Sequence, residues 1–308
     1  MATLTPPLLL LLLFVSFLTG AFSSTFTITN NCNHAIWPGL LSSSGSPPLS
    51  TTGFQLSPGE SRALDAPPGW SGRVWARTLC AADPATSRFS CATGDCGSGE
   101  VECLGGGAAP PATLAEFTLG GGGGNDFYDV SLVDGYNIAM LLSPQGGHGP
   151  NCGPTGCLVD LNGLCPADLR VVSGGASVAC KSACEAFRSP QYCCSGDYSS
   201  PATCRPSAYS QFFKNACPRA YSYAYDDATS TFTCATGAAN YVITFCPTTS
   251  SLKSSGGNPE AAGLPLMNET VVFMRGANQS SYAPEWSPNP LLFLALSSLL
   301  TALQVIIY

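Results

Sequence analysis

Cysteine is the residue type in this sequence with the clearest capacity for chemistry, and there are sixteen of them. They extend from Cys32 to Cys246, and nine fall within residues 152–217. Thiols pair as disulfides in an oxidising compartment, whereas clusters of Cys and His bind zinc. The chain has only two histidines, so we expect no metal and no other cofactor. The even count predicts eight disulfides, with the adjacent Cys193 and Cys194 paired to different partners, because a bridge between neighbours is strained.

Other catalytic patterns are missing from the sequence. His34 lies close to Cys32, His148 lies in a glycine-rich loop, and neither belongs to a recognisable Ser-His-Asp arrangement. The glycine run at 120–124 lacks the strand-to-helix context of a phosphate-binding loop. We therefore expect the two histidines and the glycine run to have surface or structural roles.

Composition excludes several classes of protein. Apolar residues make up 45% of the chain and charged residues 10%, which is incompatible with a disordered protein. The formal net charge is −7, and no basic face is available for nucleic acid. Attraction to anionic lipid is disfavoured for the same reason. The high content of Gly and Pro predicts many turns and few long helices.

The first 23 residues have the pattern of a secretory signal peptide. An apolar run at 8–18 is followed by the small residues Thr19, Gly20 and Ala21. The run is too short for a membrane-spanning helix. We expect cleavage between Ala21 and Thr25, and hence an extracellular protein in which disulfides form.

The C-terminal part predicts attachment to the outer face of the plasma membrane. Residues 291–308 are apolar and no Lys or Arg follows them, so we favour a glycosylphosphatidylinositol (GPI) signal over a retained spanning helix. Asn278 and Ser281 are both suitable attachment residues. The preceding linker, 248–290, is rich in Ser, Gly and Pro and holds both glycosylation sequons, at Asn268 and Asn278.

Short alternating segments between these ends predict a mostly β fold. Strands are expected at 25–29, 73–78, 113–119 and 241–245, and a hairpin over 127–141 around Asp134-Gly135. A helical period over 177–187 would place Cys180 and Cys184 one turn apart, and a short helix is expected within 206–217. The cysteine-dense segments 152–217 and 80–103 are interpreted as lobes stabilised by bridges rather than by a large apolar core.

Eight motifs together resemble the thaumatin-like family of plant defence proteins (pathogenesis-related group 5). The resemblance covers residues 24–247, all sixteen cysteines fall in register with it, and the motifs occupy 72–80, 91–97, 111–117, 126–131, 133–137, 191–194, 209–214 and 243–247.

The resemblance implies a fold of three lobes and a disulfide pairing. The lobes are a β-sandwich, a disulfide-rich second lobe and a small disulfide-stapled third lobe. The implied pairs are Cys32–Cys246, Cys80–Cys91, Cys96–Cys103, Cys152–Cys234, Cys157–Cys217, Cys165–Cys180, Cys184–Cys193 and Cys194–Cys204.

The family also has an acidic cleft between the sandwich and the disulfide-rich lobe. The resemblance places five residues of this chain there, namely Arg73, Glu116, Asp129, Asp134 and Asp226. Carboxylates gathered in one cleft repel one another, which raises some pKa values, and a raised acid beside an ionised carboxylate can cleave a glycosidic bond. Glu116 and Asp129 are the candidate catalytic pair, and Arg73 could keep one carboxylate ionised. Aromatic rings for sugar stacking could come from Tyr128, Tyr136, Tyr221 and Tyr223.

Two classes of function remain open at this stage. The first is a monomeric, secreted antifungal protein that binds β-1,3-glucan in the cleft and has at most weak endo-β-1,3-glucanase activity. The second is a non-enzymatic interaction module that binds a receptor or partner protein at the cell surface. Asp134, Asp226 and Glu116 also have plain structural interpretations, as turn residues or as a solvated strand residue, and binding without cleavage is the favoured use of the cleft.

Overall fold

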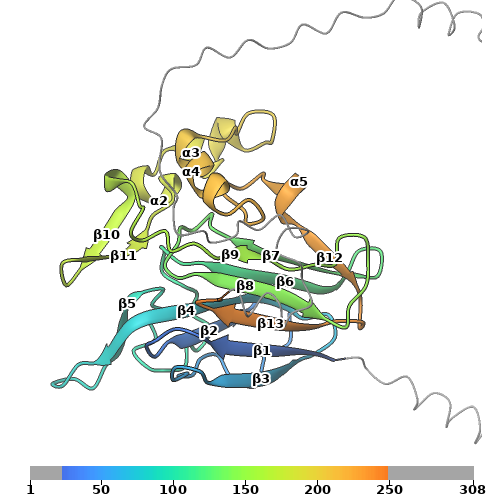
Figure 1. Cartoon of the computed structure of the whole chain (residues 1–308), viewed down its shortest axis with the longest axis horizontal. Helices are drawn as coiled ribbons and strands as arrows, with labels where there is room; N and C mark the ends of the chain where they lie inside the picture. Colours follow the sequence, from blue (N-terminus) through green and yellow to red (C-terminus); the bar gives the residue numbers. More distant parts are fainter. Residues whose placement is uncertain (1–22, 249–308) are drawn as a thin grey trace, which may run out of the picture. The chain divides into compact units, whose positions relative to one another are not determined.

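A computed structural model describes residues 23–248 of the chain (Figure 1). The predicted signal peptide, nearly all of the linker, the sequons, the anchor sites and the apolar tail lie outside the described residues. Within residues 23–248, no helix is long and apolar enough to cross a membrane.

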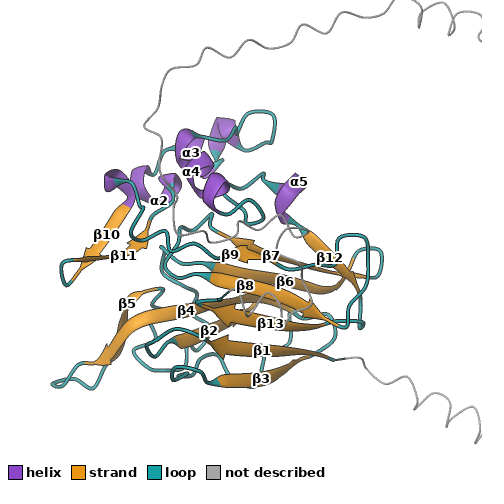
Figure 2. Ribbon diagram, in the orientation of Figure 1, coloured by secondary structure: helices purple, strands orange, loops and turns teal. Residues whose placement is uncertain are grey.

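Two β-sheets form the main body (Figure 2). The first sheet has the strand order β3-β1-β13-β8-β9, with bounds Ser61–Ala66, Ser24–Asn30, Asn240–Phe245, Met140–Gln145 and Thr155–Cys157. The second has the order β12-β7-β6-β4-β2, with bounds Phe232–Ala235, Asn125–Ser131, Leu114–Gly121, Ser71–Ala82 and Trp37–Ser42. Four of the expected strands, at 25–29, 73–78, 113–119 and 241–245, coincide with β1, β4, β6 and β13, which confirms the mostly β fold.

The core lies between the two sheets and follows from alternation along the strands. Phe26 and Ile28 on β1 are fully buried while their neighbours are half-exposed. The ring of Phe26 lies 4.6 Å from that of Phe117 on β6 and 6.1 Å from that of Tyr241 on β13. One aromatic cluster thus joins the sheets, and burial of each such side chain contributes about 1.5–3 kcal/mol.

The predicted hairpin over 127–141 is wrong. β7 belongs to the second sheet and β8 to the first, so the chain crosses between the sheets instead of folding back within one. A turn does occur at Gly135, which has φ +89°, and the backbone of Tyr136 then pairs with Cys180. Alternating burial has the same period in a hairpin and in two strands on facing sheets, and therefore cannot distinguish them.

The cysteine-rich lobe contains a hairpin and short helices. Its elements are η1 (Ala167–Leu169), β10 (Arg170–Ser173), β11 (Ala176–Cys180), α2 (Ala183–Phe187), α3 (Pro190–Cys193), η2 (Gly196–Tyr198) and α4 (Ala208–Ala216), and α5 (Asp227–Ser230) follows nearer to β12. The helix expected within 206–217 is confirmed by α4, where Ser207 and Ser210 form a capping box.

The helix expected over 177–187 is only half correct. Residues up to Cys180 form strand β11, because the left-handed glycines Gly174 and Gly175 fold it back on β10. The helix begins only after Ser182, whose Oγ accepts a hydrogen bond from the N–H of Glu185 at 3.2 Å. Cys180 and Cys184 consequently do not share a helical face.

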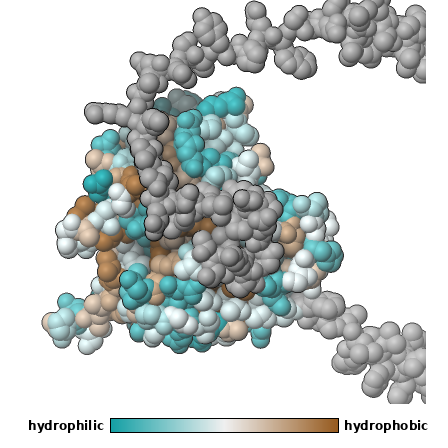
Figure 3. Space-filling view, viewed as in Figure 1, coloured by the Kyte–Doolittle hydropathy of each residue, from teal (hydrophilic) through white to brown (hydrophobic). Residues whose placement is uncertain are grey.

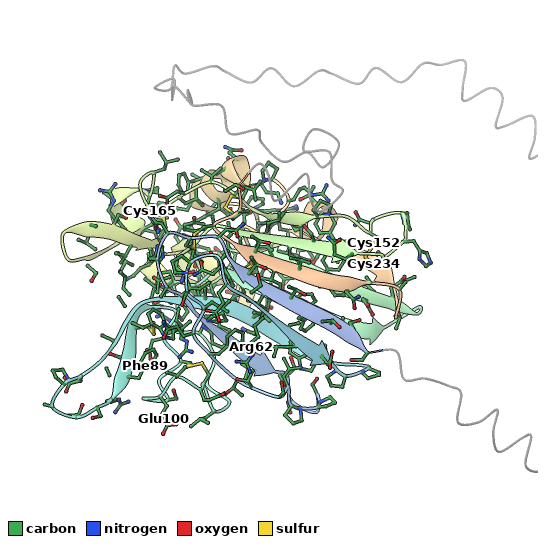
Figure 4. All side chains as sticks on the ribbon, turned by 60° about the horizontal axis from the view of Figure 1, so that its bottom comes forward. Arg62, Phe89, Glu100, Cys152, Cys165 and Cys234 are labelled. Carbon is green, nitrogen blue, oxygen red and sulfur yellow. A yellow bond between two sulfur atoms is a disulfide. The ribbon has the colours of Figure 1, made fainter. Side chains whose placement is uncertain are left out.

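The small lobe extends from the end of β4. Strand β5 (Phe89–Thr93) pairs only with β4, and the Cys80–Cys91 bridge joins the two strands. All eight disulfides match the implied pairing, and no described cysteine is free. Figure 4 shows Cys152 and Cys234 side by side, where the loop after β8 meets β12.

The bridge between Cys32 and Cys246 should be the most stabilising of the eight. It spans 214 residues, and on the chain-entropy model a loop of that length is worth about 5 kcal/mol, against about 3 kcal/mol for Cys80–Cys91, which spans 11. We expect the Cys32→Ala/Cys246→Ala variant to lose more unfolding free energy in guanidinium than the Cys80→Ala/Cys91→Ala control. An equal loss would contradict the entropic account.

Candidate functional site

A row of charged side chains crosses the outer face of the second sheet. Arg73 on β4 lies opposite Glu116 on β6, which lies opposite Asp129 on β7. Residues directly opposite each other have Cβ atoms about 4.5–5.5 Å apart. Their sequence neighbours Val74 and Ala115 point the other way and are fully buried. The alternation that builds the core therefore also builds this row.

Arg73 and Glu116 form a loose ion pair. Arg73 Nε lies 3.7 Å from Glu116 Oε1, and the side chains are 40% and 34% exposed, so the pair adds little to stability. Burial raises the pKa of Glu116, and the nearby Asp134 raises it further. Arg73 and a hydrogen bond from Ser131 act in the opposite direction. Arg73 is thus the main group that favours ionisation of Glu116.

Asp129 has the more strongly raised pKa of the two acids in the row. Burial raises its pKa well above the ordinary value, and the charges of Glu116 and Asp227 raise it further, while Arg73 lowers it. Its Oδ1 atom is buried and has no hydrogen-bond partner among residues 23–248. A carboxyl in this setting favours its protonated form and can donate a proton.

Two hollows meet at the charged row, and we call them together the groove. On one side, Ser43, Ser71, Thr118 and Phe127 line about 270 Å³. On the other side, Ser131, Asp134, Tyr221 and Asp227 are among the residues that line about 460 Å³. Arg73, Glu116 and Asp129 border both hollows, so the row lies in the middle of the groove rather than at a closed end.

The segment around Tyr221, which lines one side of the groove, is held beside β7 by backbone hydrogen bonds. The N–H of Tyr221 donates to Val130 O at 2.9 Å, and the N–H of Leu132 donates to Tyr221 O at 2.8 Å. The hydroxyl of Tyr221 donates to Asp227 Oδ1 at 2.7 Å, next to the start of α5 (Figure 1). These bonds fix the position of Asp227 relative to Asp129.

The structure brings Asp134 to the groove but not Asp226. Asp226 Oδ2 lies 2.9 Å from Lys214 Nζ and accepts hydrogen bonds from both the backbone N–H and the hydroxyl of Ser222. It ties the start of α5 to α4, and the adjacent Asp227 lines the groove instead. The sequence analysis missed Asp227, although this residue directly follows Asp226 in the sequence and was an equally available candidate.

Of the four tyrosines considered for sugar stacking, only Tyr221 lies in the groove. Tyr128 and Tyr136 are 1% exposed, and their hydroxyls donate to Gly153 O and Val159 O. Tyr223 lines a separate small hollow in the cysteine-rich lobe. Phe127 was missed, yet it lies two residues before Asp129 on the same strand, and the period of two could have found it.

Two packed sheets, eight disulfides and an acidic groove define a disulfide-rich β-sandwich protein. The chain belongs to the Thaumatin family, whose model matches residues 30–247. It is 59% identical to thaumatin-like protein 1 of Arabidopsis thaliana over 75% of this chain and 88% of that one. It is 55% identical to pathogenesis-related protein 5 of the same plant, over 80% of this chain and all of that one. It is 54% identical to a protein named glucan endo-1,3-beta-glucosidase from Prunus avium, with the same coverage.

The raised pKa of Asp129 predicts that this residue destabilises the protein at neutral pH. The folded form binds the proton more tightly than the unfolded chain does, so stability falls as pH rises from about 4, the ordinary pKa of Asp, through the raised folded value. We expect Asp129→Asn to be more stable than the parent at pH 7 and to lose that advantage at pH ~3. Denaturant titration at both pH values measures the difference.

Asp226→Asn is the matched control, with the opposite expected sign. This substitution removes the same charge, but it also breaks the ion pair between Asp226 and Lys214. The two side chains are only 12% and 24% exposed, respectively. A loss of about 1–3 kcal/mol is expected at pH 7. If both variants were destabilised at pH 7, the account of Asp129 as a strained acid would be wrong.

Proposed function

We propose that the groove binds an internal segment of a β-1,3-glucan chain and that the protein acts in antifungal defence in plants. The observation that carries this proposal is the position of the Arg73–Glu116–Asp129 row in the middle of a groove that continues on both sides. A site for a chain end would close beyond the row. The Prunus avium relative, named for action on the same polymer, supports the choice of ligand.

The lining suits a neutral polysaccharide. Carboxylate oxygens accept hydrogen bonds from sugar hydroxyls, and the guanidinium of Arg73 donates them. Phe127 on one side of the row and Tyr221 on the other offer aromatic carbon to the apolar faces of sugar rings. Because a glucan carries no charge, it can displace water from these groups without opposing the negative potential of the groove.

Cleavage is a secondary use of the same residues. Asp129, with its raised pKa, would transfer its proton to the glycosidic oxygen as the bond to the anomeric carbon breaks. Glu116, whose ionisation Arg73 favours, would act as nucleophile or would take a proton from the attacking water. The pKa of Glu116 is itself raised by burial, which limits its ionised fraction, so any hydrolysis is expected to be slow.

A second candidate function is docking to a receptor or partner protein. Phe187, Tyr192 and Tyr209 form an aromatic group on the cysteine-rich lobe, with ring centroids 5.1–5.9 Å apart. Phe187 is 40% exposed, and exposed aromatic groups are typical centres of protein interfaces. This surface is separate from the groove. A finding that the protein has no affinity for glucan would therefore favour the docking function.

Retention on insoluble β-1,3-glucan tests the proposal. We expect the parent to be retained, and Glu116→Gln and Asp227→Asn to bind about tenfold more weakly, the cost of a hydrogen bond to a charged group. Asp197→Asn makes the same change of charge at an exposed position of η2, outside the groove, so it should bind like the parent. Reducing-end release by the parent and by Asp129→Asn measures cleavage in parallel.

The outcomes separate the alternatives. No retention of the parent at low or high salt would refute glucan binding and favour protein docking. Retention that the groove variants leave unchanged would place the glucan site elsewhere. Reducing ends released by the parent and not by Asp129→Asn would show that the groove is catalytic, whereas retention without release would show a binding protein.

We also propose that the monomeric protein is secreted and attached to the outer face of the plasma membrane by a GPI anchor at Asn278 or Ser281. The apolar run at 291–308, which follows small residues such as Gly276, Ala277 and Ser281, supports this. Phosphatidylinositol-specific phospholipase applied to intact cells is expected to release the protein into the medium. Protein that stays with the cells after this treatment would argue against the anchor.

A further inference from the structure

A second cavity, of about 390 Å³, lies where the three lobes meet, and it shares no lining residue with the groove. The end of β4, the connection between β7 and β8, strand β11 and the residues after β13 all contribute to it. The space-filling view shows hydrophobic residues gathered between the β10–β11 hairpin and the strands beside it (Figure 3). The apolar side chains of the lining include Leu79, Ile138, Leu158, Val178 and Pro247.

Two polar atoms of this cavity have no partner. The amide of Asn162 donates from Nδ2 to Asn137 O at 2.9 Å and to Val178 O at 3.1 Å. Reversing the amide would place its oxygen against two carbonyls, so the orientation is fixed and Oδ1 is an acceptor. Oδ1 of Asn162 and Oγ of Ser177 are buried without a hydrogen bond among the described residues, which is costly unless a ligand or water supplies one.

The remaining polar lining favours a cation. Asp160 contributes a carboxylate two residues from Asn162, and the described residues that line the cavity include His34 but no Lys or Arg. An ammonium group, which offers three donors and a positive charge, matches a carboxylate, an amide oxygen and a hydroxyl. The apolar side chains would surround the carbon body of the same ligand.

Backbone strain at the cavity is a separate feature that is typical of a functional site. Leu79 has φ +53° and Cys246 has φ +52°, in the left-handed region that non-glycine residues rarely adopt. Both line the cavity, and Leu79 is 56% exposed although it is a large apolar residue. Strain of this kind costs about 1–3 kcal/mol per residue and clusters at ligand-binding sites.

We propose that this cavity binds a small organic amine, with the ammonium at Asp160, Asn162 and Ser177 and the apolar body against Leu79 and Val178. The site is independent of glucan binding in the groove. It would respond to amines of the extracellular fluid or to the lysine side chain of a docked peptide, which share this chemistry.

Titration of the full secreted chain by NMR, with three probes of similar shape, tests the proposal. The probes are 2-phenylethylamine, 2-phenylethanol and 3-phenylpropanoate, each used up to roughly 10 mM, as suits the weak affinity of ligands this small. We expect the amine to bind about tenfold more tightly than the alcohol, and the acid not to bind. A lysine-containing tripeptide that competes with the amine would identify a side chain as a possible occupant, and one that does not would restrict the site to free amines.

Three variants locate the site. Asp160→Asn should weaken amine binding about tenfold and leave the alcohol unchanged, whereas Ser177→Ala should weaken both. Ser177→Ala removes a hydroxyl without a partner, so its fold should persist. Asp197→Asn, an equal change of charge at an exposed position of η2, is the control and should bind like the parent. Failure of the amine to bind, equal affinity for the three probes, or equal affinity of the three variants would overturn the proposal.

Discussion

The parallel pairing of β1 with β13 is the constraint on which the remaining structure depends. It places the first and last strands of the domain side by side in the middle of the first sheet, with Phe26 opposite Tyr241, and Cys32–Cys246 locks it at one end. Neither the sheet nor the aromatic cluster against the second sheet is complete until the last strand is in place. Such non-local contacts are entropically costly to form, which explains why the longest loop carries a covalent bridge.

The acidic row follows from the same packing. β4, β6 and β7 are held in register because their inner residues, such as Val74, Ala115 and Tyr128, fill the core. A slip of one residue would bury Arg73, Glu116 and Asp129 and expose those apolar side chains. The free energy of core burial thus keeps three charged side chains adjacent despite the unfavourable desolvation of two of them.

The sequence predicted the strands, which depend on a local period, and the disulfide pairs, which follow from the register of the cysteines. It failed for segments whose path is determined by contacts with distant parts of the chain. The strands at 25–29 and 113–119 alternate clearly, and the family resemblance implied every bridge. The 127–141 hairpin failed because the chain crosses from the second sheet to the first. The helix expected over 177–187 is only half correct, because Gly174 and Gly175 fold the residues up to Cys180 back on β10 as a strand. Asp227 was missed because the orientation of α5 depends on Lys214, which holds Asp226 and leaves Asp227 for the groove.

The cost of Asp129 favours binding or catalysis over a structural role. A carboxyl retained for stability should resemble Asp226, whose oxygens accept bonds from Lys214 and Ser222. Asp129 instead has a buried oxygen without a partner in the described chain, beside two other acids, and Asn would remove the charge at little cost in shape. Asp129 also borders both hollows of the groove, where a ligand that donates a hydrogen bond would meet its carboxyl group. A sugar hydroxyl supplies such a donor without adding charge, which is why a neutral polysaccharide fits this site better than an anionic ligand does.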